Sequence, residues 1–382
     1  MSASPPLGVY LHWPYCARIC PYCDFNVRRE RGQVDEQAAL VAAMIADLEA
    51  QARLTGPRTL VSIFLGGGTP SLMRPEWAAD LIKAAGRLWT PAPQVEVTLE
   101  ANPTDAEAGR FAAFADAGVN RLSLGVQSLD DDELRFLGRN HDAGAARRAV
   151  ALAHDAFPRL SVDLIYALPE QSPELWSGRL DGALRELAPE HVSAYQLGVE
   201  PGTAFHRAVS RGGWRPANED RAVDLFEVTQ ARLAAAGFDA YEVSNHARSP
   251  EARSRHNLVY WRGEDYAAAG PGAHARLTIN GGRHGGAGRR LPSHYIRAVA
   301  ETGLGFEALE PLAPRETALE RLILGLRTTE GAALTELEPL PLDAQALHRL
   351  RGRRLLRVHK GRLTATPRGR LVLDRLCAEL AA

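Results

Sequence analysis

The chain has 382 residues, a formal net charge of −1 and 45% hydrophobic residues. This length exceeds what one average hydrophobic core organises, so it predicts two or three domains, or one barrel with an appendage. The near-zero charge argues against a global attraction to nucleic acid or to anionic membranes, and no apolar run reaches the roughly 18 residues of a transmembrane helix.

Short strand-like segments alternate with longer helical ones over the first half of the chain. The helical stretches repeat apolar residues with a period of about 3.6, and Pro75 and Pro173 stand where the first turn of a helix tolerates proline. Six strand-then-helix units predict an α/β fold whose parallel sheet is wound into a full or partial barrel. The expected strands are Gly8–Trp13, Leu60–Leu65, Val95–Glu100, Arg121–Gln127, Ser161–Tyr166 and His191–Leu197. The expected helices are Glu36–Arg53, Pro75–Leu88, Asp105–Ala117, Ala143–Asp155, Pro173–Glu186 and Asn218–Ala236.

The second half of the chain changes character twice. Residues 245–292 are rich in glycine and are predicted to be mainly loops. From about Pro314 the pattern is helix, helix, hairpin, helix, which predicts a small winged-helix-like α+β domain. Its expected elements are Arg315–Arg327, Asp343–Arg351, Leu355–Thr366 and Pro367–Leu380. We therefore expect a barrel core at 1–215, a segment that caps the barrel at 216–312 and the small domain at 313–382.

Three of the four cysteines, Cys16, Cys20 and Cys23, fall within eight residues directly after the first expected strand. Thiolates are soft ligands that select zinc or iron–sulfur clusters. A structural zinc site wants four ligands, and His12 and Cys377 are poor candidates for the fourth. A four-iron cube held by three thiolates leaves one iron open to another ligand. The spacing therefore favours a 4Fe–4S cluster, with zinc or three unrelated buried thiols as the alternatives.

The few cysteines and the N-terminal residues also bear on the compartment. Four cysteines do not make a secreted disulfide framework, and the N-terminus has neither the basic nor the apolar part of a secretory signal. We therefore expect a cytoplasmic protein.

The run Y-x-H-x-P-Y-C-x-x-x-C-x-Y-C, from Tyr10 to Cys23, resembles the signature of the radical SAM superfamily. The resemblance implies a partial (β/α)6 barrel of the TIM type and a 4Fe–4S cluster on the three cysteines. It also implies that S-adenosylmethionine (SAM) chelates the open iron and is cleaved when the cluster donates an electron. The glycine-rich loop after the second strand is by itself a weak sign, since a plain strand-to-helix turn has the same composition. The positions that match SAM contacts in this superfamily are Tyr10, Tyr22, Gly67, Gly68, Thr69, Glu100, Gln127, Arg139 and Asp163.

Further strings, such as Phe64–Ser71 and Arg121–Ser128, resemble the coproporphyrinogen III oxidase-like branch of the superfamily. Two features favour its heme chaperones, the HemW family. Phe25 stands where the oxidase carries a fourth cysteine, and the chaperone motif H-N-x-x-Y-W is present. The resemblance implies heme binding by the motif's imidazole and aromatic rings, although the same histidine could be structural. The motif residues are His256, Asn257, Tyr260 and Trp261.

Three functions follow as hypotheses, and none assigns a catalytic residue. The first is a heme chaperone that passes heme to an acceptor protein such as a respiratory hemoprotein. This hypothesis includes acceptors that are associated with a membrane. The second is an oxygen-independent coproporphyrinogen III dehydrogenase. The third is a zinc-dependent nucleic-acid-binding protein, which rests only on a basic C-terminal segment. The same segment could instead be a solvated face, a lid over the barrel or a docking surface for the heme acceptor. The basic residues are Arg349, Arg351, Arg353, Arg354, Arg357, Lys360, Arg362, Arg368 and Arg370.

Overall fold

The computed structural model of the chain describes residues 5–381. Residues 1–4 and 382 lie outside the described residues. Residues 1–4 are the start of the predicted barrel core and of the N-terminal stretch in which no secretory signal was expected. Residue 382 is the end of the predicted small domain. Within the described range, every helix is too short or too polar to cross a lipid bilayer.

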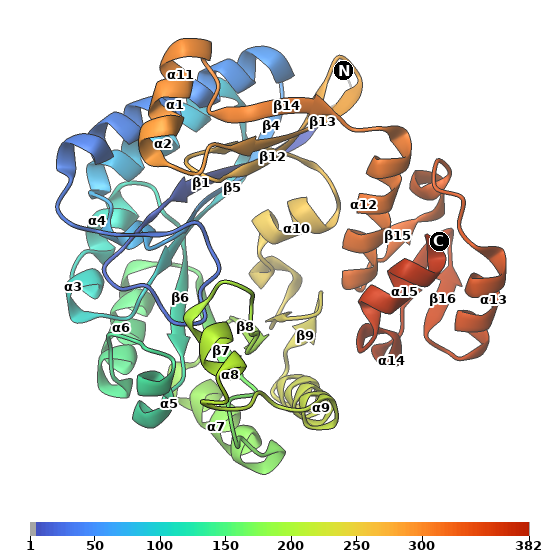
Figure 1. Cartoon of the computed structure of the whole chain (residues 1–382). Coiled ribbons are helices and arrows are strands. Elements are labelled where there is room, and N and C mark those ends of the chain that lie inside the picture. Colours follow the sequence, from blue (N-terminus) through green and yellow to red (C-terminus); the bar gives the residue numbers. More distant parts are fainter. Residues whose placement is uncertain (1–4, 382) are drawn as a thin grey trace.

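One large sheet of 12 strands forms the centre of the molecule, and its order is β14-β13-β12-β11-β1-β4-β5-β6-β7-β8-β10-β9. The six strands that the sequence predicts are confirmed as a run of parallel neighbours, and a seventh, β11, pairs in parallel on the other side of β1. The parallel strands are β1 (Pro6–Trp13), β4 (Thr59–Gly67), β5 (Thr90–Ala101), β6 (Arg121–Gln127), β7 (Leu160–Tyr166), β8 (His191–Gln196) and β11 (Asp265–Ala269). The sheet curves into an open, partial barrel (Figure 1).

The prediction of loops over residues 245–292 is wrong. That segment supplies β11, three further strands and a short helix, because backbone groups can pair into a sheet even where the side chains are small. Gly288 shows why glycine is needed there, since a Cβ on it would lie 2.8 Å from the carbonyl oxygen of Gly270. The antiparallel strands at the two edges of the sheet are β9 (Asp239–Ala240), β10 (Asn245–Ala247), β12 (His274–Ile279), β13 (Gly282–Gly288) and β14 (Phe306–Pro311).

Most helices cover the outer, convex face of the sheet (Figure 1). The predicted helix over 105–117 is divided in two where Gly109 interrupts it, since glycine is a poor helix former. The helices up to residue 302 are α1 (Val34–Thr55), α2 (Pro75–Leu88), α3 (Asp105–Ala108), α4 (Phe111–Asp116), α5 (Asp131–Phe136), α6 (Ala143–Ala156), α7 (Pro173–Leu187), α8 (Ala204–Ser210), α9 (Glu219–Ala235), α10 (Arg255–Trp261) and α11 (Pro292–Thr302), with 3₁₀ turns at η1 (Pro70–Leu72) and η2 (Pro250–Ala252).

The two faces of the parallel strands differ in chemistry, because alternate residues of a strand point to opposite sides. Leu7, Val9 and Leu11 of β1 belong to the main hydrophobic core. The concave side carries buried polar groups instead, and α10 packs against it, where His256 reaches Ser62 of β4. Figure 1 shows α10 inside the arc of the sheet. The inside of the partial barrel is therefore polar, which suits a binding site better than a core.

The C-terminal part has its own hydrophobic core, which runs from Ala318 to Leu380. The predicted order of helix, helix, hairpin and helix is found, except that the last helix is divided near Val372. Ion pairs of 2.7 Å from Arg276 to Glu320 and from Arg262 to Glu330 join this part to the barrel. Its elements are α12 (Pro314–Arg327), β15 (Ala332–Ala333), η3 (Leu334–Leu337), α13 (Ala344–Gly352), β16 (Leu356–His359), β17 (Arg362–Ala365), α14 (Pro367–Arg370) and α15 (Leu373–Leu380).

Candidate functional site

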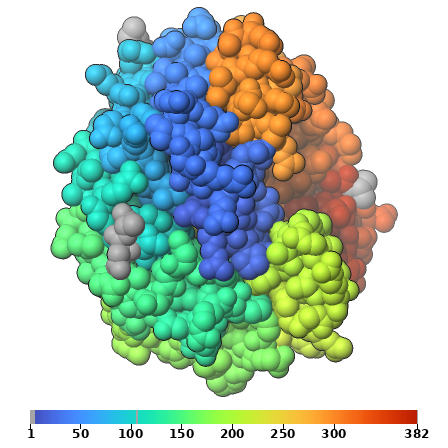
Figure 2. Space-filling model, turned by 60° about the vertical axis from the view of Figure 1, so that its left-hand side comes forward, coloured from blue at the N-terminus to red at the C-terminus, as the bar shows by residue number. Residues whose placement is uncertain are grey.

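The loop that carries the cysteines is closed at its base and tied at its sides. The short strands β2 (Tyr15–Cys16) and β3 (Arg28–Arg29) pair in parallel at the base. The side-chain amide of Asn26 donates to the carbonyl oxygens of Pro271 and Arg290 at 2.8 and 2.9 Å. On the other side, the backbone N–H of Phe205 in α8 donates to a loop carbonyl, that of residue 21, at 2.9 Å. Figure 2 shows the blue N-terminal atoms between orange atoms near α11 and yellow-green atoms near α8.

A first cavity, of about 410 Å³, lies between this loop and the carboxyl ends of the parallel strands. All three predicted cluster ligands line it, and all four cysteines of the chain are free thiols. Eight of the nine residues predicted to contact SAM line it as well, and Tyr10 is the exception. The eight are Tyr22, Gly67, Gly68, Thr69, Glu100, Gln127, Arg139 and Asp163.

Arg139 reaches from the connection after β6 to the cysteine loop. Its Nη1 donates to Cys20 Sγ at 3.3 Å and to the Tyr22 hydroxyl at 3.4 Å, and its Nη2 donates to the carbonyl oxygen of Gly125 at 2.9 Å and to Asn102. A guanidinium held beside a sulfur favours the anionic thiolate. Burial acts in the opposite direction and raises the pKa of Cys16 to about 11. Burial therefore favours the neutral thiol of Cys16, whose proton metal binding would release.

Two carboxylates lie deeper in the same cavity. Glu100 accepts a hydrogen bond from the backbone N–H of Gly67 at 3.1 Å, and Asp163 accepts from the Ser123 hydroxyl at 3.1 Å. Burial, with the neighbouring charge of Asp163, raises the pKa of Glu100 to about 8. Burial also raises the pKa of Asp163 to about 6. A ligand with a positive charge, such as an ammonium or sulfonium, would stabilise the ionised carboxylates.

One side chain of the first cavity combines an unusual backbone conformation with an unpaired polar atom. Gln127 has a φ of +66°, in the left-handed region that only a few non-glycine residues adopt. Its Oε1 is buried and has no hydrogen-bond partner among the described residues. A buried polar atom without a partner is uncommon and indicates a missing donor. The cysteines, the arginine, the carboxylates and this amide fit a cluster with a polar, cationic co-ligand.

Comparison with known proteins gives the family. The sequence profile of the Radical SAM superfamily matches residues 10–181, and that of the HemN C-terminal domain matches residues 312–372. The heme chaperone HemW of Mycobacterium tuberculosis is 37% identical over 97% of this chain and 93% of its own length. The Escherichia coli heme chaperone HemW is 41% identical over 74% of this chain and 73% of its own length. The chain belongs to the HemW family of radical SAM proteins.

Two further relatives bear on this family. The mitochondrial radical S-adenosyl methionine domain-containing protein 1 of Bos taurus is 43% identical over 85% of this chain and 74% of its own length. The solved structure of coproporphyrinogen III oxidase (HemN) from Escherichia coli, described as a radical SAM enzyme, superposes with a TM-score of 0.81. It covers 100% of this chain and 91% of that one at 21% identity, so it shows that the fold is shared.

The H-N-x-x-Y-W motif of this HemW-family chain lies on α10, inside the barrel. His256 is 1% exposed, its Nδ1 lies 3.0 Å from the Ser62 hydroxyl, and its Nε2 lies 2.8 Å from the Tyr260 hydroxyl. Burial lowers the pKa of His256 to about 3, so the ring is neutral. Trp261 faces the C-terminal part, where the Arg327 guanidinium lies 5.0 Å from its ring centre. Heme ligation by His256 stays a prediction. The burial of the ring and the hydrogen bonds of both its nitrogens argue against it.

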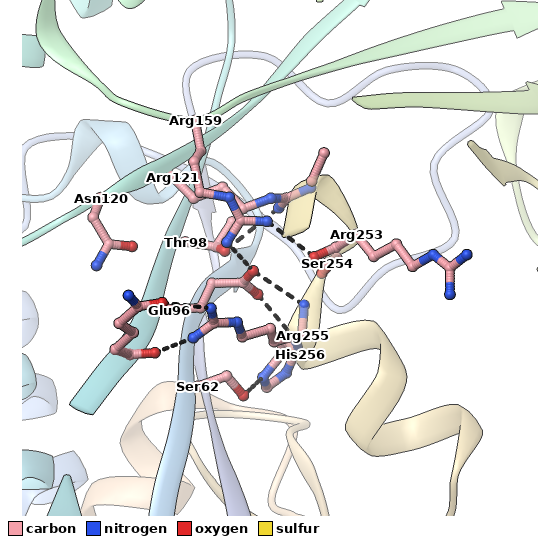
Figure 3. A network of polar contacts seen from close by, with 12 residues as sticks. Ser62, Glu96, Thr98, Asn120, Arg121, Arg159, Arg253, Ser254, Arg255 and His256 are labelled. Atoms are coloured by element: carbon pink, nitrogen blue, oxygen red, sulfur yellow. Dashed lines mark hydrogen bonds and ion pairs between the residues drawn. The ribbon is translucent and has the colours of Figure 1, made fainter. Parts of the chain in front are cut away.

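The carboxylate of Glu96 fixes the start of α10 (Figure 3). It accepts from the backbone N–H groups of Arg255 and His256, both at 3.0 Å, and from Arg159 Nη1 at 2.7 Å. Burial raises the pKa of Glu96, but Arg121, Arg159 and the two N–H groups outweigh it, so the pKa lies below its ordinary value. A negative charge at the first turn of a helix also interacts favourably with the helix dipole.

A second cavity, of about 320 Å³, adjoins the first, since Phe25, Gly67 and Glu100 line both. This cavity was not predicted from the sequence, because β12 and its neighbours were expected to be loops. Tyr10 and Tyr260 of the predicted sets lie here. The missed residues of this cavity are His12, Asn26, Tyr266, Gly272 and His274. In the first cavity, Gln196, Leu197 and Glu200 were missed, although the end of the sixth strand could have pointed to them.

The raised pKa of Glu100 predicts a pH dependence of stability in the cluster-free protein. The folded state keeps the Glu100 proton up to about pH 8, whereas an unfolded glutamate loses it near pH 4.3. This contribution to stability is present at low pH and is lost as pH rises towards 8. We expect Glu100→Gln, which is neutral throughout, to gain up to about 1.4 kcal/mol per pH unit relative to the unsubstituted protein between pH 5 and 8.

Urea unfolding of both proteins at several pH values measures this difference. Glu30→Gln is the matched control, because Glu30 is only partly buried and lines neither cavity, and its variant should show no comparable slope. A difference between Glu100→Gln and the unsubstituted protein that does not change with pH would contradict the assignment.

Proposed function

We propose that this chain is a heme chaperone that carries a 4Fe–4S cluster and SAM in the first cavity. It would bind heme and pass it to an acceptor protein, of which a respiratory hemoprotein is one example, in the cytoplasm or at its membrane surface. Relatives named heme chaperone HemW cover most of the chain at 37–41% identity, which supports the proposal.

The observation that carries the proposal is the side chain at position 25. In the oxidase branch a fourth cysteine is expected there, and this chain has Phe25, whose ring is 63% exposed at the border of the two cavities. A large apolar ring in solvent is a contact for an apolar ligand, and a porphyrin face is planar and apolar. A phenyl ring offers neither a nucleophile nor a metal ligand, so Phe25 contributes binding contacts only.

Within the first cavity, different residues would hold the cluster and SAM. Cys16, Cys20 and Cys23 would hold three irons of the cluster, and the Arg139 guanidinium would stabilise the sulfur charge. Glu100 and Gln127 would accept hydrogen bonds from the amino or hydroxyl groups of SAM. When bound, the cluster and SAM supply one-electron chemistry. The cysteine loop is tied on both sides by Asn26 and Phe205, which would hold the three thiols in position for the cluster.

The test is a hemin titration of the full chain, with and without a reconstituted cluster and without oxygen. Saturable binding with a defined stoichiometry, followed by transfer to an apo-hemoprotein, is the expected result. Incubation with coproporphyrinogen III, SAM and a reductant tests the alternative, the oxygen-independent dehydrogenase. Formation of the divinyl product would overturn the proposed function.

A further inference from the structure

The second cavity holds the groups that a planar iron ligand needs. Phe25 at its mouth is the most exposed large apolar side chain of the described residues. Its walls carry the rings of Tyr10, Tyr260 and Tyr266, of which Tyr260 and Tyr266 lie edge to face at 4.4 Å between centroids. Its volume lies near the lower end of small-molecule sites, about 300–1,000 Å³, so a larger flat ligand would protrude towards solvent.

Three imidazoles lie in or beside this cavity, and two of them have no free nitrogen. His12 is 5% exposed, with Nδ1 at 3.0 Å from the Tyr10 hydroxyl and Nε2 at 3.0 Å from the carbonyl oxygen of Asn26. His256 is bonded through both nitrogens in the same way. To bind iron, either ring would have to give up a hydrogen bond and become exposed.

His274 is the third imidazole, and it differs from the other two in its exposure and in its hydrogen bonding. It is the first residue of β12, it is exposed, and among the described residues its ring has no hydrogen-bond partner. Partial burial and the nearby charge of Arg276 hold its pKa below the ordinary value, so the ring is neutral near pH 7. A neutral imidazole with a free nitrogen is the form that binds heme iron.

We propose that His274, rather than His256, provides the axial nitrogen to the heme iron, with the macrocycle against Phe25 in the second cavity. This inference rests on the proposed heme-binding function and deepens it. His256 is a positioning residue: it links Ser62 of β4 to Tyr260, and so places the Tyr260 ring in the cavity wall. A protruding heme with one exposed ligand is also suited to transfer, because the acceptor can reach the iron from the open side.

The experiment is a hemin titration of the full chain, with electron paramagnetic resonance of the saturated protein to report the axial ligand. We expect His274→Ala to lose the imidazole signature and to bind hemin at least about 10-fold more weakly, because even an outer-shell partner of a metal ligand contributes roughly 10- to 100-fold to affinity. Added free imidazole should restore the signature, because position 274 is open to solvent. Phe25→Ala should bind more weakly but keep the signature.

The two histidines are separated by a second variant. His256→Gln should lower the unfolding free energy while keeping the imidazole signature at saturation. His284→Ala, on the neighbouring strand β13, is the matched control and should change neither property. Loss of the signature in His256→Gln with its retention in His274→Ala would overturn the inference and leave the proposed function standing. Retention in both variants would also overturn it, and failure of the unsubstituted protein to bind hemin would overturn both.

Discussion

Replacing Cys20 by alanine should leave the chain without a 4Fe–4S cluster after anaerobic reconstitution. A cube held by only two thiolates loses a strong anionic ligand, and Arg139 Nη1, at 3.3 Å from Cys20 Sγ, loses its charged partner. Cys20 is only partly buried, so the fold should tolerate the change better than at the buried Cys16. The measurements are the visible charge-transfer absorbance, together with iron and acid-labile sulfide analysis.

Cys377→Ala is the matched control for the cluster experiment. Its thiol lies on α15 in the C-terminal core and lines neither cavity. This variant should keep full cluster content. Retention of the cluster by Cys20→Ala, or stoichiometric zinc in place of iron in the unsubstituted protein, would contradict the assignment of the three cysteines.

Replacing Glu96 by alanine should lower the free energy of unfolding by about 3–5 kcal/mol, the cost of breaking one partner out of a buried charge pair. The Glu96 side chain is 0% exposed and bonds to Arg159, 18% exposed, at 2.7 Å. Without it, the charge of the buried Arg121 loses a nearby carboxylate, Arg159 keeps the more distant carboxylate of Glu190 at 3.5 Å, and two N–H groups at the start of α10 lose their acceptor. Urea unfolding of the cluster-free protein measures the change.

An exposed ion pair gives the control for Glu96. Glu49 accepts from Arg87 at 2.9 Å, and the two side chains are 39% and 68% exposed. Pairs of this kind contribute about 0–1 kcal/mol, so Glu49→Ala should change the unfolding free energy by no more than about 1 kcal/mol. If Glu96→Ala were as mild as Glu49→Ala, the network of Figure 3 would not be what holds α10 in the barrel.

These predictions differ in how far the sequence alone could have led to them. The cluster experiment follows from the sequence, because Cys16, Cys20 and Cys23 are close along the chain and any local fold keeps them together. The Glu96 experiment does not, because the two backbone N–H groups that donate to Glu96 lie 159 and 160 residues further along the chain. Nothing near Glu96 in the sequence distinguishes it from an ordinary strand residue.

The sequence by itself determined the six parallel strands, the order of the C-terminal elements and most of the first cavity. Strand and helix periods are local, and parallel strands bring their carboxyl ends to one edge, so residues such as Gly67, Glu100 and Gln127 had to meet there. The tertiary structure alone decided the second cavity and the burial of His256. The second cavity depends on β11 and β12 extending the sheet beyond β1, and the burial of His256 depends on α10 packing against β4. These contacts join residues that are distant along the chain, so no local pattern of side chains predicts them.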